Sequence, residues 1–189
     1  MDAKIRCSWC ESSDLMREYH DKEWGTPQHD DNIIFEYILL DTFQAGLSWS
    51  TILNKRENFR KAFSNFDPVK ISKYTEADYK RLMNDPGIIR NRLKIRAIIN
   101  NANVFLKLQK EYGTFDKYIW QFVDYKTIQN NATEGNIAST SNESDAMSKD
   151  LKKQGFKFVG STICYAFMQG CGMINDHTVD CFRYNELKR

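Results

Sequence analysis

Residues 155–181 read GFKFVGSTICYAFMQGCGMINDHTVDC, and this stretch decides the fold. A charged amphipathic run at 145–154 precedes it, and an apolar run with helical spacing begins at Ser161 or Thr162. The pattern predicts two helices joined by a hairpin near residues 155–162.

The turn of this hairpin has two interpretations. Gly160 lets another backbone approach closely, and the free N–H groups of Gly160, Ser161 and Thr162 suit a nucleic-acid phosphate. A basic cluster that includes Lys157 leads directly into the turn. Short glycine-containing connections are also common between helices, and basic runs are usually solvated helix faces. An ordinary turn is therefore the alternative.

Soft metal ligands lie near both ends of the chain. His177 and Cys181 are four residues apart, which predicts that they share one face of a helical turn, and Cys7, Cys10 and His20 are further candidates. Two ligands from each end would form a closed structural zinc site that ties the ends together. Spacing does not decide among the candidates, and a Cys or His of this kind also fits ordinary core packing.

Length and composition describe an ordinary globular chain. Its 189 residues are enough for one sizeable core, and its net charge of +2 is too small for a general polyanion binder. No apolar run of about 18 residues is present, so no membrane contact is expected. The five cysteines, an odd number, favour a reducing compartment over a disulfide framework. We expect a soluble, cytoplasmic protein.

Helical periodicity runs through the chain, and no window shows sustained alternation of period two, so the predicted architecture is all-α with about eight helices. Asp30 or Asp31 is the predicted cap of a helix from Asn32 to about Ala45. The other main helices are expected over 49–63, over a long run ending at Tyr112 and over 116–123, and a polar loop is expected over 126–143.

Asp41 interrupts the apolar stripe of the helix expected to end near Ala45. The helix macrodipole disfavours negative charge there, so Asp41 is a functional candidate, or else it lies solvated at the edge of the stripe. Gly46 stops the helix and leaves Leu47 at a turn tip before Ser48, the next predicted N-cap. An apolar residue at such a tip is packed down or is offered to a partner, as in DNA-bending and base-flipping proteins.

Several stretches occur in one family's order and span nearly the whole chain. They are Cys7-Ser8-Trp9, Tyr19-His20-Asp21-x-Glu23-Trp24-Gly25, Gln44-Ala45-Gly46-Leu47-Ser48-Trp49, Lys55-Arg56-Glu57-Asn58, Phe66-Asp67-Pro68-Val69-Lys70, Gly87-Ile88-Ile89-Arg90, Ser144-Asp145-Ala146, Gly155-Phe156-Lys157-Phe158-Val159-Gly160 and Asn175-Asp176-His177. Together they resemble the 3-methyladenine DNA glycosylase I family.

The resemblance implies an all-α helix-hairpin-helix glycosylase fold, with one domain over 1–189. It also implies one structural zinc ion that joins the N-terminal segment 1–25 to the C-terminal segment 172–189. The ligands that it implies for this ion are Cys7, His20, His177 and Cys181. Cys10 is left outside the site.

The same resemblance implies a pocket for a flipped, methylated base. It places Trp9, Tyr19 and Trp49 around that base, Gly46 and Leu47 at the gap left in the duplex, and the Gly160 turn on the phosphate backbone. The family pattern has Glu where this sequence has Asp41, so the acid's reach is shorter by about one C–C bond. A direct contact with the base then becomes water-mediated, or the base preference changes.

The implied activity is excision of 3-methyladenine from double-stranded DNA by a monomeric repair enzyme, with Asp41 and Tyr19 as catalytic residues and an abasic site as product. One alternative is a non-enzymatic DNA-binding homologue. Another is a zinc-stapled structural protein whose Trp9 and Trp49 pack with no cavity between them. Asp176 is expected to cap a turn or to orient a metal-bound His, and His29 is expected at the surface without a partner.

Overall fold

The structure is a computed structural model that describes residues 4–188; residues 1–3 and 189, the outer ends of the predicted domain, lie outside it. Its helices are, in chain order, η1 (Ser8–Ser12), α1 (Asp14–Lys22), α2 (Asp31–Gln44), α3 (Trp49–Leu53), α4 (Arg56–Ala62), η2 (Ser64–Phe66), α5 (Pro68–Ile71), α6 (Glu76–Met83), α7 (Arg92–Tyr112), α8 (Phe115–Trp120), η3 (Gln121–Val123), α9 (Asn142–Gln154), α10 (Ser161–Gly170) and α11 (Phe182–Glu186). None of these helices is long and apolar enough to cross a membrane. The strands are β1 (Ile128–Gln129) and β2 (Ile174–Asn175).

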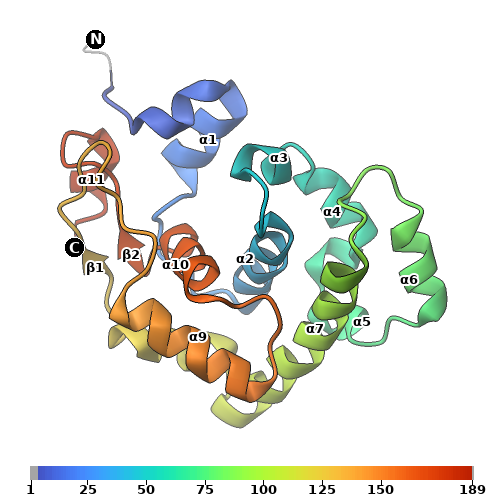
Figure 1. Ribbon diagram of the computed structural model, residues 1–189. Coiled ribbons are helices and arrows are strands. Elements are labelled where there is room, and N and C mark those ends of the chain that lie inside the picture. The colour runs from blue at the N-terminus through green and yellow to red at the C-terminus, as the bar shows by residue number, and fades with distance from the viewer. Residues whose placement is uncertain (1–3, 189) are drawn as a thin grey trace.

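Helix α2 lies at the centre of the molecule and packs against α3, α7, α8 and α10 (Figure 1). Every residue from Ile34 to Phe43 is buried. A helix that buries all of its faces needs a neighbour on each of them, which explains this central position. Asp30 caps α2 as the sequence predicts, because its Oδ1 accepts hydrogen bonds from the N–H groups of Asn32 (2.8 Å) and Ile33 (3.3 Å).

The helices predicted on either side of the hairpin are α9 and α10, which pack against each other (Figure 1). Gly155 ends α9 with φ +105°, a conformation that favours glycine. Asn101 of α7 then holds the turn at both backbone groups of Lys157. Its Nδ2 donates to the Lys157 carbonyl (3.0 Å), and its Oδ1 accepts from the Lys157 N–H (2.8 Å). The turn is therefore tied to the core before α10 begins.

Two expectations about secondary structure are corrected. The helix predicted over 49–63 is two helices, α3 and α4, which separate at Asn54 and Lys55. The all-α expectation also misses β1 and β2, which pair in parallel with Ile128 opposite Ile174. Strands of two residues are too short to show the alternation that identifies strands in a sequence. The fold is mostly helical, with this one small parallel pair in its described part.

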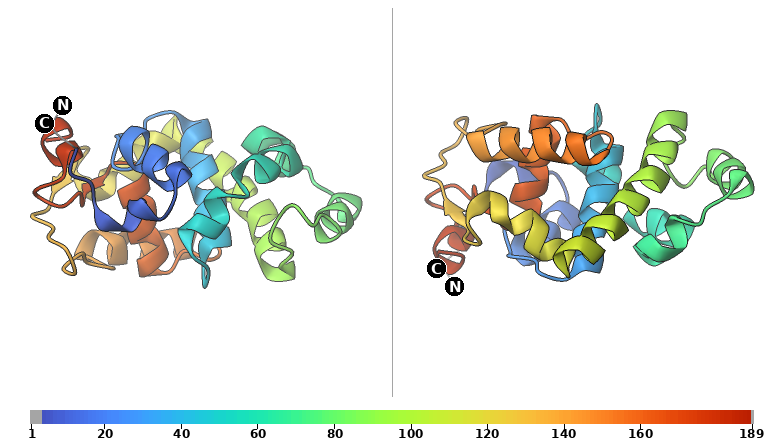
Figure 2. Two further views of the ribbon diagram at one scale, coloured as in Figure 1. Left: turned by 90° about the horizontal axis from the view of Figure 1, so that it is seen from above. Right: turned by 90° about the horizontal axis from the view of Figure 1, so that it is seen from below.

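The two ends of the described chain lie together at one end of the molecule (Figure 2). The Phe182 N–H donates to the Ile5 carbonyl at 3.0 Å. The helical turn predicted for His177 and Cys181 is wrong, because α11 begins only at Phe182. Asn175 accepts a hydrogen bond from the His177 N–H (3.3 Å), and such local side-chain bonds favour a turn over a helix.

Candidate functional site

A cavity of about 410 Å³ opens beside α1, α2, α3 and α10. Its lining includes four aromatic rings, one acid and two amides: Trp9, Tyr19, Trp24, Trp49, Asp41, Gln44 and Gln169. A concave site of this size with a few polar groups is typical of small-ligand binding. The alternative of a packed aromatic core, with no cavity between Trp9 and Trp49, is therefore wrong.

Three rings from three elements form the wall of this cavity. Trp9 lies on η1, Tyr19 on α1 and Trp49 at the start of α3. The ring centroids of Tyr19 and Trp49 are 5.2 Å apart, and those of Trp9 and Tyr19 are 6.5 Å apart. Ser48 places Trp49, because its Oγ caps α3 by accepting from the Thr51 N–H (3.2 Å). Burial raises the pKa of Tyr19 well above its usual value, so its hydroxyl keeps its proton.

Asp41 is buried in the wall contributed by α2, with 4% of its surface exposed. The alternative of a solvated Asp41 at the edge of the helix stripe is therefore wrong. Its Oδ2 is buried without a hydrogen-bond partner, and so is Nε1 of Trp49. Burial raises the pKa of Asp41 well above its usual value. Unpaired buried polar atoms are costly, so two of them at one cavity indicate a site that a ligand completes.

The turn after α2 presents an exposed apolar side chain. Gly46 has φ +79°, the left-handed conformation that ends a helix. Leu47 is 40% exposed, so of the two predicted alternatives it is offered outward and not packed down. Lys94 of α7 supports the turn from inside, because its Nζ donates to the carbonyls of Phe43 (2.8 Å) and Ala45 (2.5 Å).

The hairpin residues predicted to contact a phosphate lie together at the start of α10. Gly160 is its N-cap, with φ −65°, and no atom lies within 4 Å of the Cβ that a substitution would add. Ser161 is tied to the core through a 2.8 Å hydrogen bond between its Oγ and Ser144 Oγ. Thr162 and Lys157 are exposed. A side chain added at Gly160 would therefore meet open space at the start of α10.

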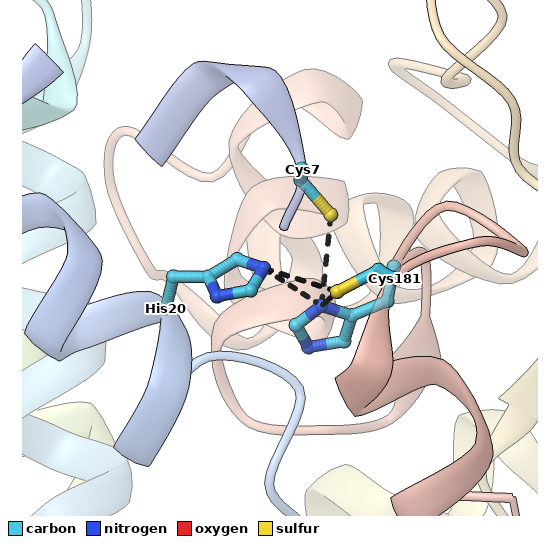
Figure 3. A group of neighbouring side chains, drawn as sticks. Cys7, His20 and Cys181 are labelled. Atoms are coloured by element: carbon cyan, nitrogen blue, oxygen red, sulfur yellow. Dashed lines mark hydrogen bonds between the residues drawn. The ribbon is translucent and has the colours of Figure 1, made fainter. Parts of the chain in front are cut away.

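A second cluster lies where the two chain ends meet, and Figure 3 shows its side chains converging from separate segments. It consists of four buried residues whose ligand atoms all lie within 4.8 Å of one another: Cys7, His20, His177 and Cys181. Cys10 points elsewhere, because its Sγ donates to the Cys7 carbonyl (3.1 Å). The folded chain therefore brings four of the five candidate ligands together and leaves Cys10 out, a distinction that sequence spacing could not make.

Several neighbours orient the four donors. Nδ1 of His20 lies 2.8 Å from Asp21 Oδ1, Nε2 of His177 lies 3.1 Å from the Trp24 carbonyl, and the Thr178 N–H donates to Cys7 Sγ (3.4 Å). The interaction between the two cysteine side chains raises the pKa of Cys7 and lowers the pKa of Cys181, which the bonds from both histidines lower further. The cluster therefore has the donors and the fixed ring orientations of a metal site.

The sequence pattern described as methyladenine glycosylase matches residues 9–184. The chain belongs to the methyladenine glycosylase family. DNA-3-methyladenine glycosylase 1 of Escherichia coli (strain K12) is 49% identical over 180 residues, which cover 95% of this chain and 96% of that protein.

Solved structures agree with this family assignment. A crystal structure of 3-methyladenine DNA glycosylase I superposes with a TM-score of 0.91 at 47% identity, covering 94% of this chain and 98% of the other. The Staphylococcus aureus 3-methyladenine DNA glycosylase I, solved to show the basis of 3-methyladenine recognition, gives 0.90 at 35% identity over 94% and 95% of the two chains. The predicted family resemblance is confirmed.

Two side chains of this family member have partners other than those predicted. Asp176 does not orient a histidine of the cluster: it faces α10, where Tyr165 donates to its Oδ2 at 2.7 Å. Asp21 orients His20 instead. His29 is exposed as expected, but it does have a partner, since its Nδ1 lies 2.8 Å from Asp116 Oδ1.

Two residues, one behind the turn after α2 and one in the cavity wall, were missed from the sequence. Lys94 stands in the sequence beside Arg92 and Arg96, in a basic run of the kind that usually forms a solvated helix face, yet it is 5% exposed. Its spacing of four from Ile98, on the apolar face of α7, is the signal that could have revealed it. Gln169 stands in the apolar stretch of α10 and lines the cavity, and no feature of its sequence neighbourhood distinguishes it.

Proposed function

We propose that this chain excises 3-methyladenine from alkylated double-stranded DNA by hydrolysing the N-glycosidic bond, which leaves an abasic site. Its relatives carry the name DNA-3-methyladenine glycosylase and cover nearly the whole chain. The observation that carries the proposal is the open, ring-lined cavity with a buried, unpaired acid at its wall.

The chemistry of the lesion suits this cavity. Methylation at N3 makes adenine in DNA cationic and weakens its glycosidic bond, so the base leaves without strong acid catalysis. The protein has to extrude the nucleotide, stabilise an oxocarbenium-like sugar and admit water at C1′. The faces of Trp9 and Trp49 favour a cationic ring over a neutral one. Tyr19, whose hydroxyl keeps its proton, offers a hydrogen-bond donor.

We assign Asp41 to recognition of the hydrogen-bonding edge of the base. Its carboxyl group has no hydrogen-bond partner among residues 4–188, and a cationic base supplies both a charge and donors. The resemblance puts a longer Glu at this position, so Asp41 reaches less far into the cavity, and a bridging water then completes its contact.

We propose that this chain, as a helix-hairpin-helix glycosylase, contacts DNA through two separate turns. Leu47, exposed beside the cavity mouth at Ser48 and Trp49, fills the gap that the extruded nucleotide leaves. Gly160, Ser161 and Thr162 hold a phosphate at the start of α10, and Lys157 adds a positive charge. We propose that a monomer carries all of these parts.

We further propose that the Cys-His cluster binds one structural zinc ion. Tetrahedral zinc with sulfur and nitrogen ligands places the ligand atoms about 3.3–3.8 Å apart. Four of the separations in the cluster are 3.2, 3.5, 3.5 and 3.7 Å. Four protein ligands leave no position for substrate, so the ion would fasten the chain ends and take no part in the reaction.

Metal analysis tests the zinc proposal. Purified protein should contain about one zinc per chain, as a closed site of four protein ligands requires. Cys181→Ala should lose most of it. Cys10→Ala is the matched control, because Cys10 is an equally buried thiol outside the ligand set, and it should keep its zinc. Equal metal content in the two variants would contradict the proposal.

A base-release assay tests the enzymatic proposal. Wild-type protein should release free 3-methyladenine from methylated duplex DNA, and Asp41→Asn should lower the single-turnover rate at least about tenfold by removing one charge-assisted contact. Asp41→Glu retains the charge and should remain active. Asp124→Asn is the control, since Asp124 is exposed and its φ of +50° suits Asn. Binding to DNA without base release by the wild type would favour the non-enzymatic alternative.

A further inference from the structure

Gln169 shares the cavity wall with Asp41 and Trp49, and its side chain is held by a second buried acid. Its Nε2 donates to Asp176 Oδ2 at 2.7 Å. Asp176 is 1% exposed and follows β2, just before the metal cluster. Neither the zinc site nor the proposed recognition by Asp41 uses this contact, so it calls for its own explanation.

The surroundings of Asp176 fix which way round the Gln169 amide lies. Tyr165 Oη also donates to Asp176 Oδ2 (2.7 Å), and Asn130 Nδ2 donates to Oδ1 (2.7 Å). A carboxylate only accepts hydrogen bonds, so the amide group that faces it has to be the nitrogen. Turning the Gln169 amide over would place an oxygen against this carboxylate.

The other end of the amide is therefore determined as well. Oε1 of Gln169 makes no hydrogen bond within residues 4–188 and is not among the sealed, unpaired atoms of the interior. It is the polar atom that the Gln169 side chain has left for the cavity. Asp41 and Gln169 thus each offer a hydrogen-bond acceptor to one cavity, and that of Gln169 is a neutral atom whose orientation is fixed by Asp176.

We infer that Gln169 determines specificity, with its Oε1 accepting a hydrogen bond from the exocyclic amino group of the extruded adenine, and that Asp176 is the positioning residue that keeps Oε1 turned to the base. This inference rests on the proposed excision of 3-methyladenine. Guanine carries a carbonyl where adenine carries the amino group. If 3-methylguanine lay in the same position, its carbonyl oxygen would face Oε1 of Gln169. Both atoms are acceptors, so no hydrogen bond would form.

The fixed orientation is what makes discrimination possible. An unrestrained glutamine amide can present its NH₂ group or its oxygen, so it would serve both purines equally well. Once Asp176 binds the NH₂ group, turning the amide to suit guanine would break that bond and leave a buried carboxylate with one donor fewer. Specificity then arises from a penalty on the wrong base as well as from a bond to the right one.

The test measures both released bases from the same methylated duplex DNA, by chromatography under single-turnover conditions. Wild-type protein should release 3-methyladenine faster than 3-methylguanine. In Gln169→Leu this ratio should fall about tenfold, the loss expected when one buried hydrogen bond and one unpaired acceptor are removed. Asp176→Asn retains the shape of the site and presents either amide group to Gln169, so the ratio should fall there too.

A purely structural role for either residue predicts a different result. Loss of packing alone would slow release of the two bases by the same factor and leave their ratio unchanged, which would overturn the inference. Gln129→Leu is the matched control: Gln129 is also half-buried, donates to the Leu187 carbonyl (3.4 Å) and accepts from Asn175 (2.8 Å), but lies outside the cavity lining. Its ratio should remain that of the wild type.

The outcomes also separate this inference from the proposed function. If wild-type protein releases no methylated base, both the proposed function and the inference that rests on it are wrong. If it releases 3-methyladenine and 3-methylguanine equally fast, the proposed function stands and the role of Gln169 is wrong. This comparison uses the wild-type protein alone, so it tests the inference even if Gln169→Leu folds poorly.

Discussion

Single residues in this protein are informative where they break the pattern of their helix. Asp41 interrupts an apolar stripe, and that irregularity alone made it a functional candidate before the cavity was known. Gln169 breaks no pattern, because a half-buried amide on a core helix is ordinary. Its role depends on Asp176, which approaches from a distant segment. The sequence therefore reveals a site residue such as Asp41, which departs from the local pattern. It does not reveal one such as Gln169, whose role depends on a contact with a distant residue.

The buried acid should reduce stability in a pH-dependent way. Because burial raises the pKa of Asp41 above its ordinary value of 3.8, the folded protein binds that proton more tightly than the unfolded chain does. The stability that this proton contributes is fully present below about pH 4 and is lost as the pH rises through the raised pKa. Asp41→Asn should therefore melt close to the wild type at pH 4 and higher than the wild type at pH 7.

Thermal unfolding followed by circular dichroism at both pH values checks this expectation. A gain of at least about 2 °C at pH 7 corresponds to roughly 1 kcal/mol for a chain of this size. Asp124→Asn serves again as the exposed control. A difference between Asp41→Asn and the wild type that stays the same from pH 4 to pH 7 would show that Asp41 ionises normally.

At the scale of elements, most helix boundaries follow from local chemistry. Asp30 and Ser48 each cap a helix through their own side chains, as predicted, and Asp67 caps α5 in the same way. Asp31, the alternative cap for α2, reaches instead to another helix and accepts from the N–H groups of Phe115 and Asp116 at the start of α8. Contacts of this kind join distant segments, and no local pattern in the sequence predicts them.

Lys94 gives a prediction for the end of α2. Lys94→Met leaves the carbonyls of Phe43 and Ala45 without their donor, so we expect a loss of about 1–3 kcal/mol in the free energy of unfolding. Lys107→Met on the exposed face of the same helix should cost less than about 0.5 kcal/mol. Urea titration of the two variants measures both values. Similar losses would mean that Lys94 does not support the turn.

Gly160 gives a prediction for the start of α10. Gly160→Ala should leave the melting temperature unchanged, because its φ is negative and the added Cβ meets no atom within 4 Å. Any loss of affinity for undamaged duplex then reports a close approach of the DNA itself. Gly160→Asp should weaken binding further through repulsion of phosphate, and this extra loss should shrink as salt is added.

Fluorescence anisotropy with a labelled duplex at two salt concentrations follows these changes. Asn185→Asp provides the comparison, since it adds the same charge at an exposed position on α11. Unchanged affinity of Gly160→Asp at low salt would remove the α10 turn from the proposed DNA contact.

For the whole molecule, the decisive arrangement is the meeting of the two chain ends. Sequence spacing supplied five candidate ligands at the ends but no reason to pair them, and only the family resemblance chose four. Two features were hidden for the same reason: the parallel pair of β1 and β2 and the interior position of Asp176 both involve residues far apart in the chain. Local patterns predicted the helices well, whereas these long-range contacts required the folded molecule.

Removal of the proposed zinc ion should loosen this junction before the helical core. A chelator should raise the amide exchange rate of Thr178, whose N–H faces Cys7 Sγ, and of Phe182, whose N–H binds the Ile5 carbonyl. The amide of Ile95 in α7 should stay protected, because it belongs to a separately packed helix. Hydrogen exchange read by NMR distinguishes the cases. Equal acceleration at all three sites would indicate global unfolding instead.

The rings of the cavity wall continue directly into the metal cluster. The ring of Trp9 lies 5.4 Å from that of His20, and Trp24 lies 4.6 Å from His177, measured between centroids. Indole emission responds to the charge and polarity of adjacent groups, so a change at the imidazoles is visible as light from the wall of the pocket. The protein consequently carries an unlabelled optical signal, through which loss of the proposed zinc ion and binding of the proposed base can be followed in one cuvette.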